Sequence, residues 1–213
     1  MRTASDPYFR LPEVAPQSPG ASPFRMKGDS YNAAMLFLNG RVPGGFSAVV
    51  AAMTPEMQSF FKQSFRPGDW YDVVPNPYMH LIAARLRGIP FRTHIRDNGA
   101  WHADHAMRGS LRTLLRVFSH ENVATWLPRI SANYHDFGRC ETKAVGPGRV
   151  RGVRNGMPRA LVPWYTTLSA SFCEKALSIV GAKDPHMLYG QAEPEGTRGG
   201  QDIYSLHFEI TWS

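Results

Sequence analysis

The first two thirds of the chain carry the hydrophobic spacing of helices. Thr54, a favourable N-cap residue, comes before a segment in which a hydrophobic side chain recurs every three or four positions, at Met57, Phe60, Phe61 and Phe65. Similar spacing recurs over residues 75–88, 91–118 and 120–134. The pattern therefore predicts a helical part over about residues 41–137.

Three stretches leave alternatives open. Residues 33–38 form a hydrophobic run too short to tell a strand from a buried helical turn. Residues 91–118 read as one long helix, or as two helices with a break at Asn98-Gly99. Pro128 is expected to kink the helix that Ser119 caps, because proline has no N–H to donate.

After Gly138 the pattern changes to short alternating segments. The sequence predicts a hairpin that turns at Gly146-Pro147-Gly148, then an amphipathic helix over residues 159–181. Two alternating strands follow, at 186–193 and 202–212, joined by a glycine-rich loop. Helices followed by strand–strand–helix–strand–strand indicate an α+β fold, with an N-terminal helical layer packed on a C-terminal antiparallel sheet.

The N-terminus differs in composition from the rest of the chain. Residues 1–24 hold five prolines together with several Ser, Ala and Gly, which is typical of a flexible arm. The remaining 25–213 have the length of a single domain, divided into a helical part and a sheet-plus-helix part over about 138–213.

Composition supports a folded chain outside the membrane. With 43% hydrophobic and 12% aromatic residues, the chain can bury a sizeable core. No hydrophobic run approaches the roughly 20 residues that cross a bilayer, and the N-terminus has no secretory hydrophobic region. Cys140 and Cys173 lack a CxxC partner. We therefore expect a cytoplasmic protein with two free thiols.

The net charge of +7 raises the question of a polyanion partner. The basic residues are dispersed, and the densest cluster has no aromatic residue on which a base could stack. Its arginines are Arg149, Arg151, Arg154 and Arg159. A solvated basic hairpin explains this cluster at least as well as specific nucleic-acid binding, which we do not expect.

His102 and His105 are the clearest metal candidates. They stand three positions apart in a predicted helix, so both could reach one ion. A zinc or iron site usually needs a third protein ligand, which only His80, His94 or His135 could supply through the fold. An exposed polar helix face explains the pair without a metal.

Residues 134–141 contain the residue types of a cysteine nucleophile with a base. Cys140 would be the nucleophile and His135 the base, but nothing in the sequence fixes their distance or the pKa of the thiol. A helix end followed by Gly138 and a strand explains the same residues structurally.

Aromatic residues supply the candidates for a ligand pocket. Six of them could surround a planar or apolar ligand, or could instead cement helix–sheet contacts: Trp70, Tyr71, Trp101, Tyr134, Trp164 and Tyr165. Asp69 and Asp72 flank the Trp70-Tyr71 pair without a partner for acid–base chemistry, so we interpret that stretch as a structural corner.

Several phrases also resemble known proteins. Pro67, Gly68 and Trp70-Tyr71-Asp72, with Tyr134, Asp136, Phe137 and Gly138, resemble a family of myxobacterial proteins of about this length, over roughly residues 40–213. That resemblance implies a fold but no activity. The element order of the last 75 residues also resembles the ligand-binding fold of 4-vinyl-reductase-like and haem-NO-binding proteins. The chain lacks the Tyr-x-Ser-x-Arg phrase of the haem branch.

Together these observations favour a non-catalytic binding module for a small molecule or protein partner. We expect a homodimer that serves as a regulatory or accessory factor in a specialised-metabolite pathway. We predict no cofactor, with haem or a metal as open alternatives. A metal- or histidine-dependent enzyme is the second interpretation, with a site between the long helix and the sheet that uses His102 and His105 together with His80 or His135. Polyanion binding is the third.

Overall fold

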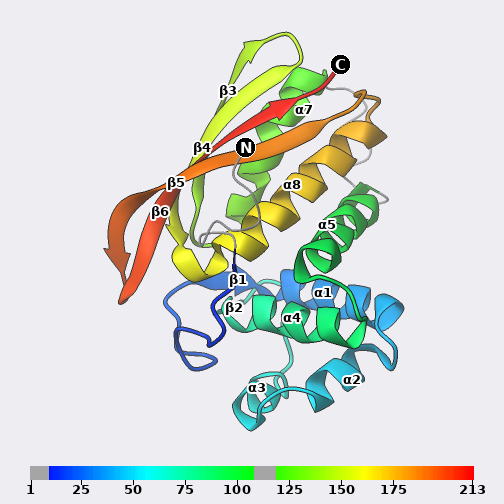
Figure 1. Cartoon of the computed structure of the whole chain (residues 1–213), viewed down its shortest axis with the longest axis vertical. Helices are drawn as coiled ribbons and strands as arrows, with labels where there is room; N and C mark the ends of the chain where they lie inside the picture. The colour runs from blue at the N-terminus through cyan, green and yellow to red at the C-terminus, as the bar shows by residue number, and fades with distance from the viewer. Residues whose placement is uncertain (1–9, 108–118) are drawn as a thin grey trace.

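The computed structural model describes residues 10–107 and 119–213 (Figure 1). Its elements, in chain order, are β1 (Arg25–Lys27), α1 (Gly28–Arg41), α2 (Gly45–Ala51), α3 (Pro55–Phe60), β2 (Trp70–Asp72), α4 (Pro75–Leu86), α5 (Phe91–Met107), α7 (His120–Trp126), the 3₁₀ helix η2 (Leu127–Asn133), β3 (Arg139–Gly146), β4 (Arg149–Pro158), the 3₁₀ turn η3 (Arg159–Leu161), α8 (Val162–Ile179), β5 (His186–Arg198) and β6 (Gln201–Thr211). The α+β expectation is confirmed.

The four long strands form one antiparallel sheet in the order β3-β4-β6-β5. Strand β6 shows the predicted alternation from Leu206 on, because Leu206, Phe208 and Ile210 are buried on one face. Before them Tyr204 is buried, rather than Ile203 as the sequence predicts. The β3–β4 hairpin turns after Gly146, as predicted, whereas β5 and β6 extend through the glycine-rich segment to a tight turn at Gly199-Gly200. Positive φ angles at these two glycines permit that turn.

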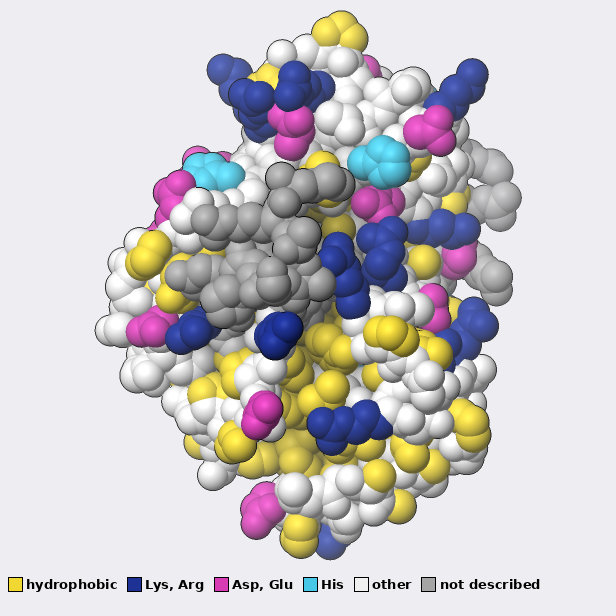
Figure 2. Space-filling model, viewed as in Figure 1, with side chains coloured by type: hydrophobic (Ala, Val, Ile, Leu, Met, Phe, Trp, Pro, Cys, Tyr) yellow, Lys and Arg dark blue, Asp and Glu magenta, His cyan; other side chains and the backbone are white. Residues whose placement is uncertain are grey.

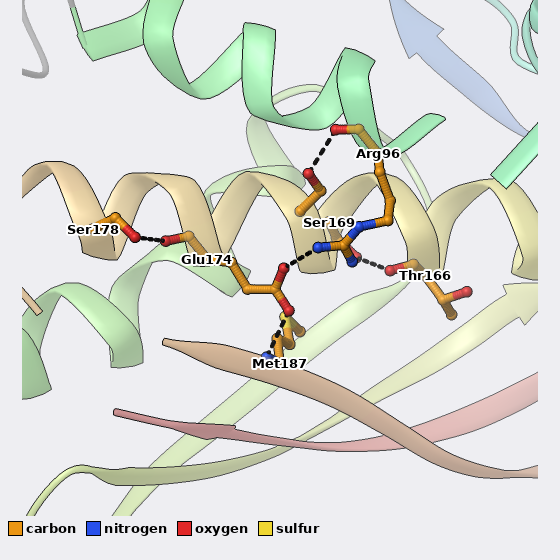
Figure 3. Close-up of polar contacts among 7 residues, drawn as sticks. Arg96, Thr166, Ser169, Glu174, Ser178 and Met187 are labelled. Carbon is orange, nitrogen blue, oxygen red and sulfur yellow. Dashed lines mark hydrogen bonds and ion pairs between the residues drawn. The ribbon is translucent and has the colours of Figure 1, made fainter. Parts of the chain in front are cut away.

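Helix α8 lies between the sheet and α5 (Figure 1). Glu174 on α8 connects both neighbours, accepting hydrogen bonds from Arg96 on α5 at 2.7 Å and from the Met187 backbone N–H on β5 at 3.1 Å (Figure 3). The Ser171 hydroxyl adds a second link by donating to the Arg96 carbonyl at 2.6 Å. These contacts fix α5 relative to the sheet, and α5 carries several residues of the candidate site.

The N-terminal helices pack around aromatic side chains. The Tyr31 ring stacks on Phe65 at 4.3 Å between centroids, and its hydroxyl donates to the Asp72 carbonyl at 2.6 Å. The Asp72 carboxylate accepts from the backbone N–H groups of Gly20, Ser22 and Val74. The stretch around Trp70-Tyr71 is therefore a structural corner, where residues 20–24 dock on the start of α4.

Where the sequence left alternatives, the structure selects among them. The stretch at 33–38 lies inside helix α1 rather than in a strand. Helix α5 runs unbroken through Asn98-Gly99 up to Met107, and residues 108–118 lie outside the described chain. Pro128 does not merely kink a helix, because α7 ends at Trp126 and the 3₁₀ helix η2 follows. Across both described ranges, no helix is long and apolar enough to cross a bilayer.

Candidate functional site

A cavity of about 380 Å³ lies between the N-terminal helices, η2 and α8. Its wall is mainly apolar, with contributions from Met26, Ala33, Ala34, Leu127, Leu168 and Phe172. The volume falls in the range of small-molecule sites, roughly 300–1,000 Å³. Polar residues on several elements converge on this apolar space, which makes it the candidate binding site.

His135, just after η2, lines the cavity and carries an unprotonated ring nitrogen. Its Nδ1 lies 3.3 Å from the Ser131 carbonyl oxygen, which can only accept a hydrogen bond, so the ring proton resides on Nδ1. Nε2 is buried and has no protein partner within the described residues. Burial, and then the positive charge of Arg154, lowers the pKa of His135 to about 4. At neutral pH this histidine is therefore an uncharged lone-pair donor.

Arg154 on β4 brings a buried positive charge to the same cavity. Its side chain is 1% exposed, and its guanidinium donates to the carbonyls of Pro128 and Gly138 and to the Ser131 hydroxyl, at 2.6 to 2.7 Å. The Tyr165 ring covers it at 4.8 Å. Among the described residues no carboxylate lies within ion-pair distance, and Nε has no partner. A buried cation without an anion favours a ligand that carries negative charge.

On another part of the wall, α4 and α5 contribute three buried polar side chains. His80, Asn76 and Asn98 are each at most 2% exposed and line the cavity. Each has one buried nitrogen or oxygen atom without a partner in the described chain. Because unsatisfied buried polar groups are costly, these atoms point to a polar occupant of the cavity.

The predicted metal pair lies near this wall without gathering a third ligand. His102 lines the cavity, and burial, followed by the neighbouring His105, lowers its pKa to about 4. His105 also lines the cavity, but it is exposed and stacks on Trp101 at 4.8 Å. Across residues 10–107 and 119–213, no group of three His, Cys, Asp or Glu side chains is placed to hold a metal ion.

The six aromatic candidates divide into two groups. Tyr134, Trp164 and Tyr165 line the cavity. The other three lie elsewhere: Trp70 is 44% exposed beneath Lys27, Tyr71 bonds to the turn before it, and Trp101 packs on Phe37 and His105. Their spacing along the sequence could not reveal this division, because it depends on which helices meet.

Cys140 lies at the start of β3, in surroundings unlike those of an activated nucleophile. Burial raises the pKa of its thiol, so the thiol remains protonated at neutral pH. Cys173 lines the cavity, and burial raises its pKa to about 12. Both cysteines are free. The thiol chemistry considered from residues 134–141 therefore gains no support from the structure.

The four arginines of the basic cluster do not form one surface. Arg149 and Arg151 alternate onto the same face of β4 and both pair with Glu209 at 2.8 Å. Arg154 stands an odd number of positions further on and is buried, so it cannot contact a polyanion at the surface. Arg159 is exposed beyond the end of the strand. On the face shown in Figure 2, basic side chains are spread out rather than gathered in one patch.

The sequence pattern does not identify Asn76, Asn98 and Arg154 as cavity residues. The segment around Arg154 is rich in glycine and arginine, which predicts an exposed position. The positions of the two asparagines are informative, because each lies on a helix face that is otherwise buried. A polar residue at such a position is informative, because burial requires a partner.

Comparison with known proteins identifies the fold. No family model matches the chain, and no curated protein matches it in sequence. Solved structures do match. One is an H-NOX structure from a study of haem distortion in that family, with a TM-score of 0.61 and 12% identity. The alignment covers 88% of this chain and 95% of the H-NOX chain. An oxygen-binding H-NOX domain related to soluble guanylate cyclases has the same coverage and identity, with a TM-score of 0.59.

An H-NOX protein from S. oneidensis is similar to the same extent, with 11% identity, a TM-score of 0.59 and coverage of 88% of this chain and 96% of that one. The predicted likeness to the haem-NO-binding fold is therefore confirmed at the level of the fold. The resemblance to a myxobacterial family stays a prediction.

The comparison also corrects the expectation of no cofactor. That expectation depended on the missing Tyr-x-Ser-x-Arg phrase. Two structural neighbours were studied for haem distortion and haem redox potential, and a third is an oxygen-binding domain. The absence of one short phrase is therefore no basis for expecting no cofactor.

Proposed function

We propose that this chain is a ligand-binding sensor module that holds haem in the cavity between its helices and its sheet. The observation that carries the proposal is the unprotonated, unpartnered Nε2 of His135, a residue that lines an apolar cavity of about 380 Å³. The H-NOX likeness over 88% of the chain supports the choice of haem over other planar ligands.

When haem is bound, His135 would hold its iron through Nε2. Histidines that bind metals usually donate their second ring N–H to a carbonyl or carboxylate, which fixes the tautomer. The Ser131 carbonyl accepts that bond, so the free lone pair is on Nε2. His102 lines the same cavity but has no comparable hydrogen-bond partner in the described chain. We therefore assign the iron ligand to His135.

The charge and polarity of the cavity also fit haem. Arg154 is a buried cation that lacks a carboxylate among the described residues, and haem carries two carboxylates on one edge. The apolar wall excludes water from the ring, since residues such as Leu127, Leu168 and Phe172 line it. When bound, haem supplies an iron atom that can take up small ligands, and the protein supplies the fixed imidazole and the shaped cavity.

Reconstitution with hemin tests the proposal. We expect one equivalent to bind to the purified protein and to give the absorption spectrum of an imidazole-ligated haem. His135→Ala should weaken binding by more than the 10- to 100-fold that loss of an outer-shell partner costs, and added imidazole should restore the spectrum. His186→Ala, at an exposed position on β5, is the matched control and should bind as the wild type does.

Two outcomes would count against the proposal in different ways. If hemin does not bind stoichiometrically to the folded protein, the haem function is refuted. If hemin binds and the spectrum changes in His102→Ala but not in His135→Ala, the function stands and the ligand assignment is wrong. Circular dichroism of each variant separates loss of binding from loss of folding.

The role of the module in the cell is a separate part of the proposal. We propose that the module acts as a homodimer that regulates or assists a specialised-metabolite pathway. Light scattering of the purified protein at several concentrations would measure the dimer directly, and a monomer at all concentrations would refute it.

A further inference from the structure

A chain of buried hydrogen bonds leads from the surface to the cavity through α4 and α5. Arg87 pairs with Asp97 at 2.8 Å, and the Arg87 guanidinium also lies 2.9 Å from His94 Nδ1. His94 Nε2 lies 2.9 Å from His80 Nδ1. His80 and His94 are 1% and 0% exposed, and His80 lines the cavity.

These hydrogen bonds allow only one tautomer for each of the two histidines. Arginine has no acceptor and stays charged in proteins, so it donates to His94 Nδ1. Burial lowers the pKa of His94 to about 4, and burial also lowers the pKa of His80, so both rings are neutral at pH 7. His94 therefore carries its proton on Nε2 and donates it to His80 Nδ1. The proton of His80 is left on Nε2.

His80 Nε2 is buried and has no partner in the described part of the chain. We infer that His80 is a hydrogen-bond donor to the ligand, held in that state by Arg87 through His94, and that the cavity selects ligands with an acceptor atom facing α4. Asn76 and Asn98, whose amides also have unpartnered buried atoms, flank this donor and define the polar side of the site.

The inference rests on the proposed ligand-binding role of the cavity but does not require haem. Elsewhere the cavity is lined by His135 and by the charged Arg154, so the lining near η2 and β4 differs in chemistry from the lining near α4. An acceptor is favoured at α4 because the alternative is a buried N–H with no partner. An apolar group of the same size would leave that penalty in place.

The protonation of His80 can be measured in the protein without ligand. Long-range ¹H–¹⁵N correlation spectra at pH 7 distinguish a protonated from an unprotonated ring nitrogen. We expect the proton of His80 on Nε2, and a proton on Nδ1 would overturn the inference. Arg87→Met should release the constraint, so that both forms of His80 are seen, whereas Arg85→Met, at an exposed position on the same helix, should leave it unchanged.

A matched pair of probes tests the selectivity. Acetophenone and ethylbenzene have nearly the same size and no charge, and only the former has a carbonyl acceptor. We expect acetophenone to bind the wild-type protein about fivefold more tightly, the factor that corresponds to one neutral hydrogen bond. His80→Phe, which keeps an aromatic ring, should reduce the ratio to about one.

Three results would overturn the inference: equal binding of the two probes to the wild type, a preference that survives in His80→Phe, or no binding of either probe. If His80→Phe does not fold, Arg87→Met replaces it in this test. When the tautomer of His80 is no longer fixed, the variant should bind acetophenone over ethylbenzene with a smaller preference than the wild type. Hemin binding is measured in a separate experiment, by absorption spectroscopy. Failure of the haem proposal therefore does not affect this test.

Discussion

Asp72 shows how one carboxylate holds the N-terminal segment against the helical layer. It is 1% exposed and accepts three backbone N–H bonds, two of them from residues about fifty positions earlier in the chain. Asp69, on the other side of Trp70-Tyr71, is exposed. Two aspartates three residues apart therefore contribute very differently to the stability of the fold.

Replacing Asp72 by Ala should lower the free energy of unfolding by about 3 kcal/mol or more, because several buried donors lose their acceptor. Urea unfolding followed by circular dichroism measures this. Asp69→Ala is the control and should change stability by less than about 0.5 kcal/mol. Equal effects of the two substitutions would contradict the role given to Asp72.

At the scale of elements, the contact between α5 and α8 depends on Gly99. An added Cβ there would lie 2.5 Å from the Leu168 carbonyl oxygen and 3.0 Å from the Ser171 Cβ. The glycine that raised the expectation of a helix break is instead the place where two helix backbones come close. Helix α5 continues through it because packing against α8 compensates for its low helix propensity.

We expect Gly99→Ala to destabilise the protein by about 1–3 kcal/mol, since the backbone of α8 must shift to admit the methyl group. The matched substitution is Gly40→Ala on α1, where nothing lies within 4 Å of the added Cβ. Gly40→Ala should stabilise the protein slightly, by up to about 1 kcal/mol. Thermal unfolding of both variants checks the opposite signs, and a stabilising Gly99→Ala would refute the close contact.

For the whole molecule, four histidines kept neutral by their surroundings predict sensitivity to acid, and His80 and His94 among them are fully buried. Burial is the main cause that lowers the pKa of His80, His94, His102 and His135, the last three to about 4. In the unfolded chain these residues titrate near pH 6.5. Between pH 6.5 and 4 the unfolded state therefore binds more protons than the folded state. Stability is complete above that range and falls as the pH decreases through it.

At pH 5 we expect a loss of about 2 kcal/mol from His94 alone, relative to pH 7.5. Urea unfolding midpoints at pH 7.5, 6 and 5 measure the decrease. His94→Gln should reduce the slope of stability against pH, even if it lowers stability at pH 7.5. A midpoint that does not change between pH 7.5 and 5 would contradict the buried neutral state of these rings.

The sequence by itself determined the elements, because periodicity and capping are local. Thr54, Ser119 and the turn after Gly146 lie where the pattern predicted, and the alternation in β6 identified its buried face. Only the tertiary structure decided the cavity. His135, Arg154 and His80 come from three separate segments and meet there. Their protonation, burial and missing partners depend on packing between those segments, which no local pattern of residues records.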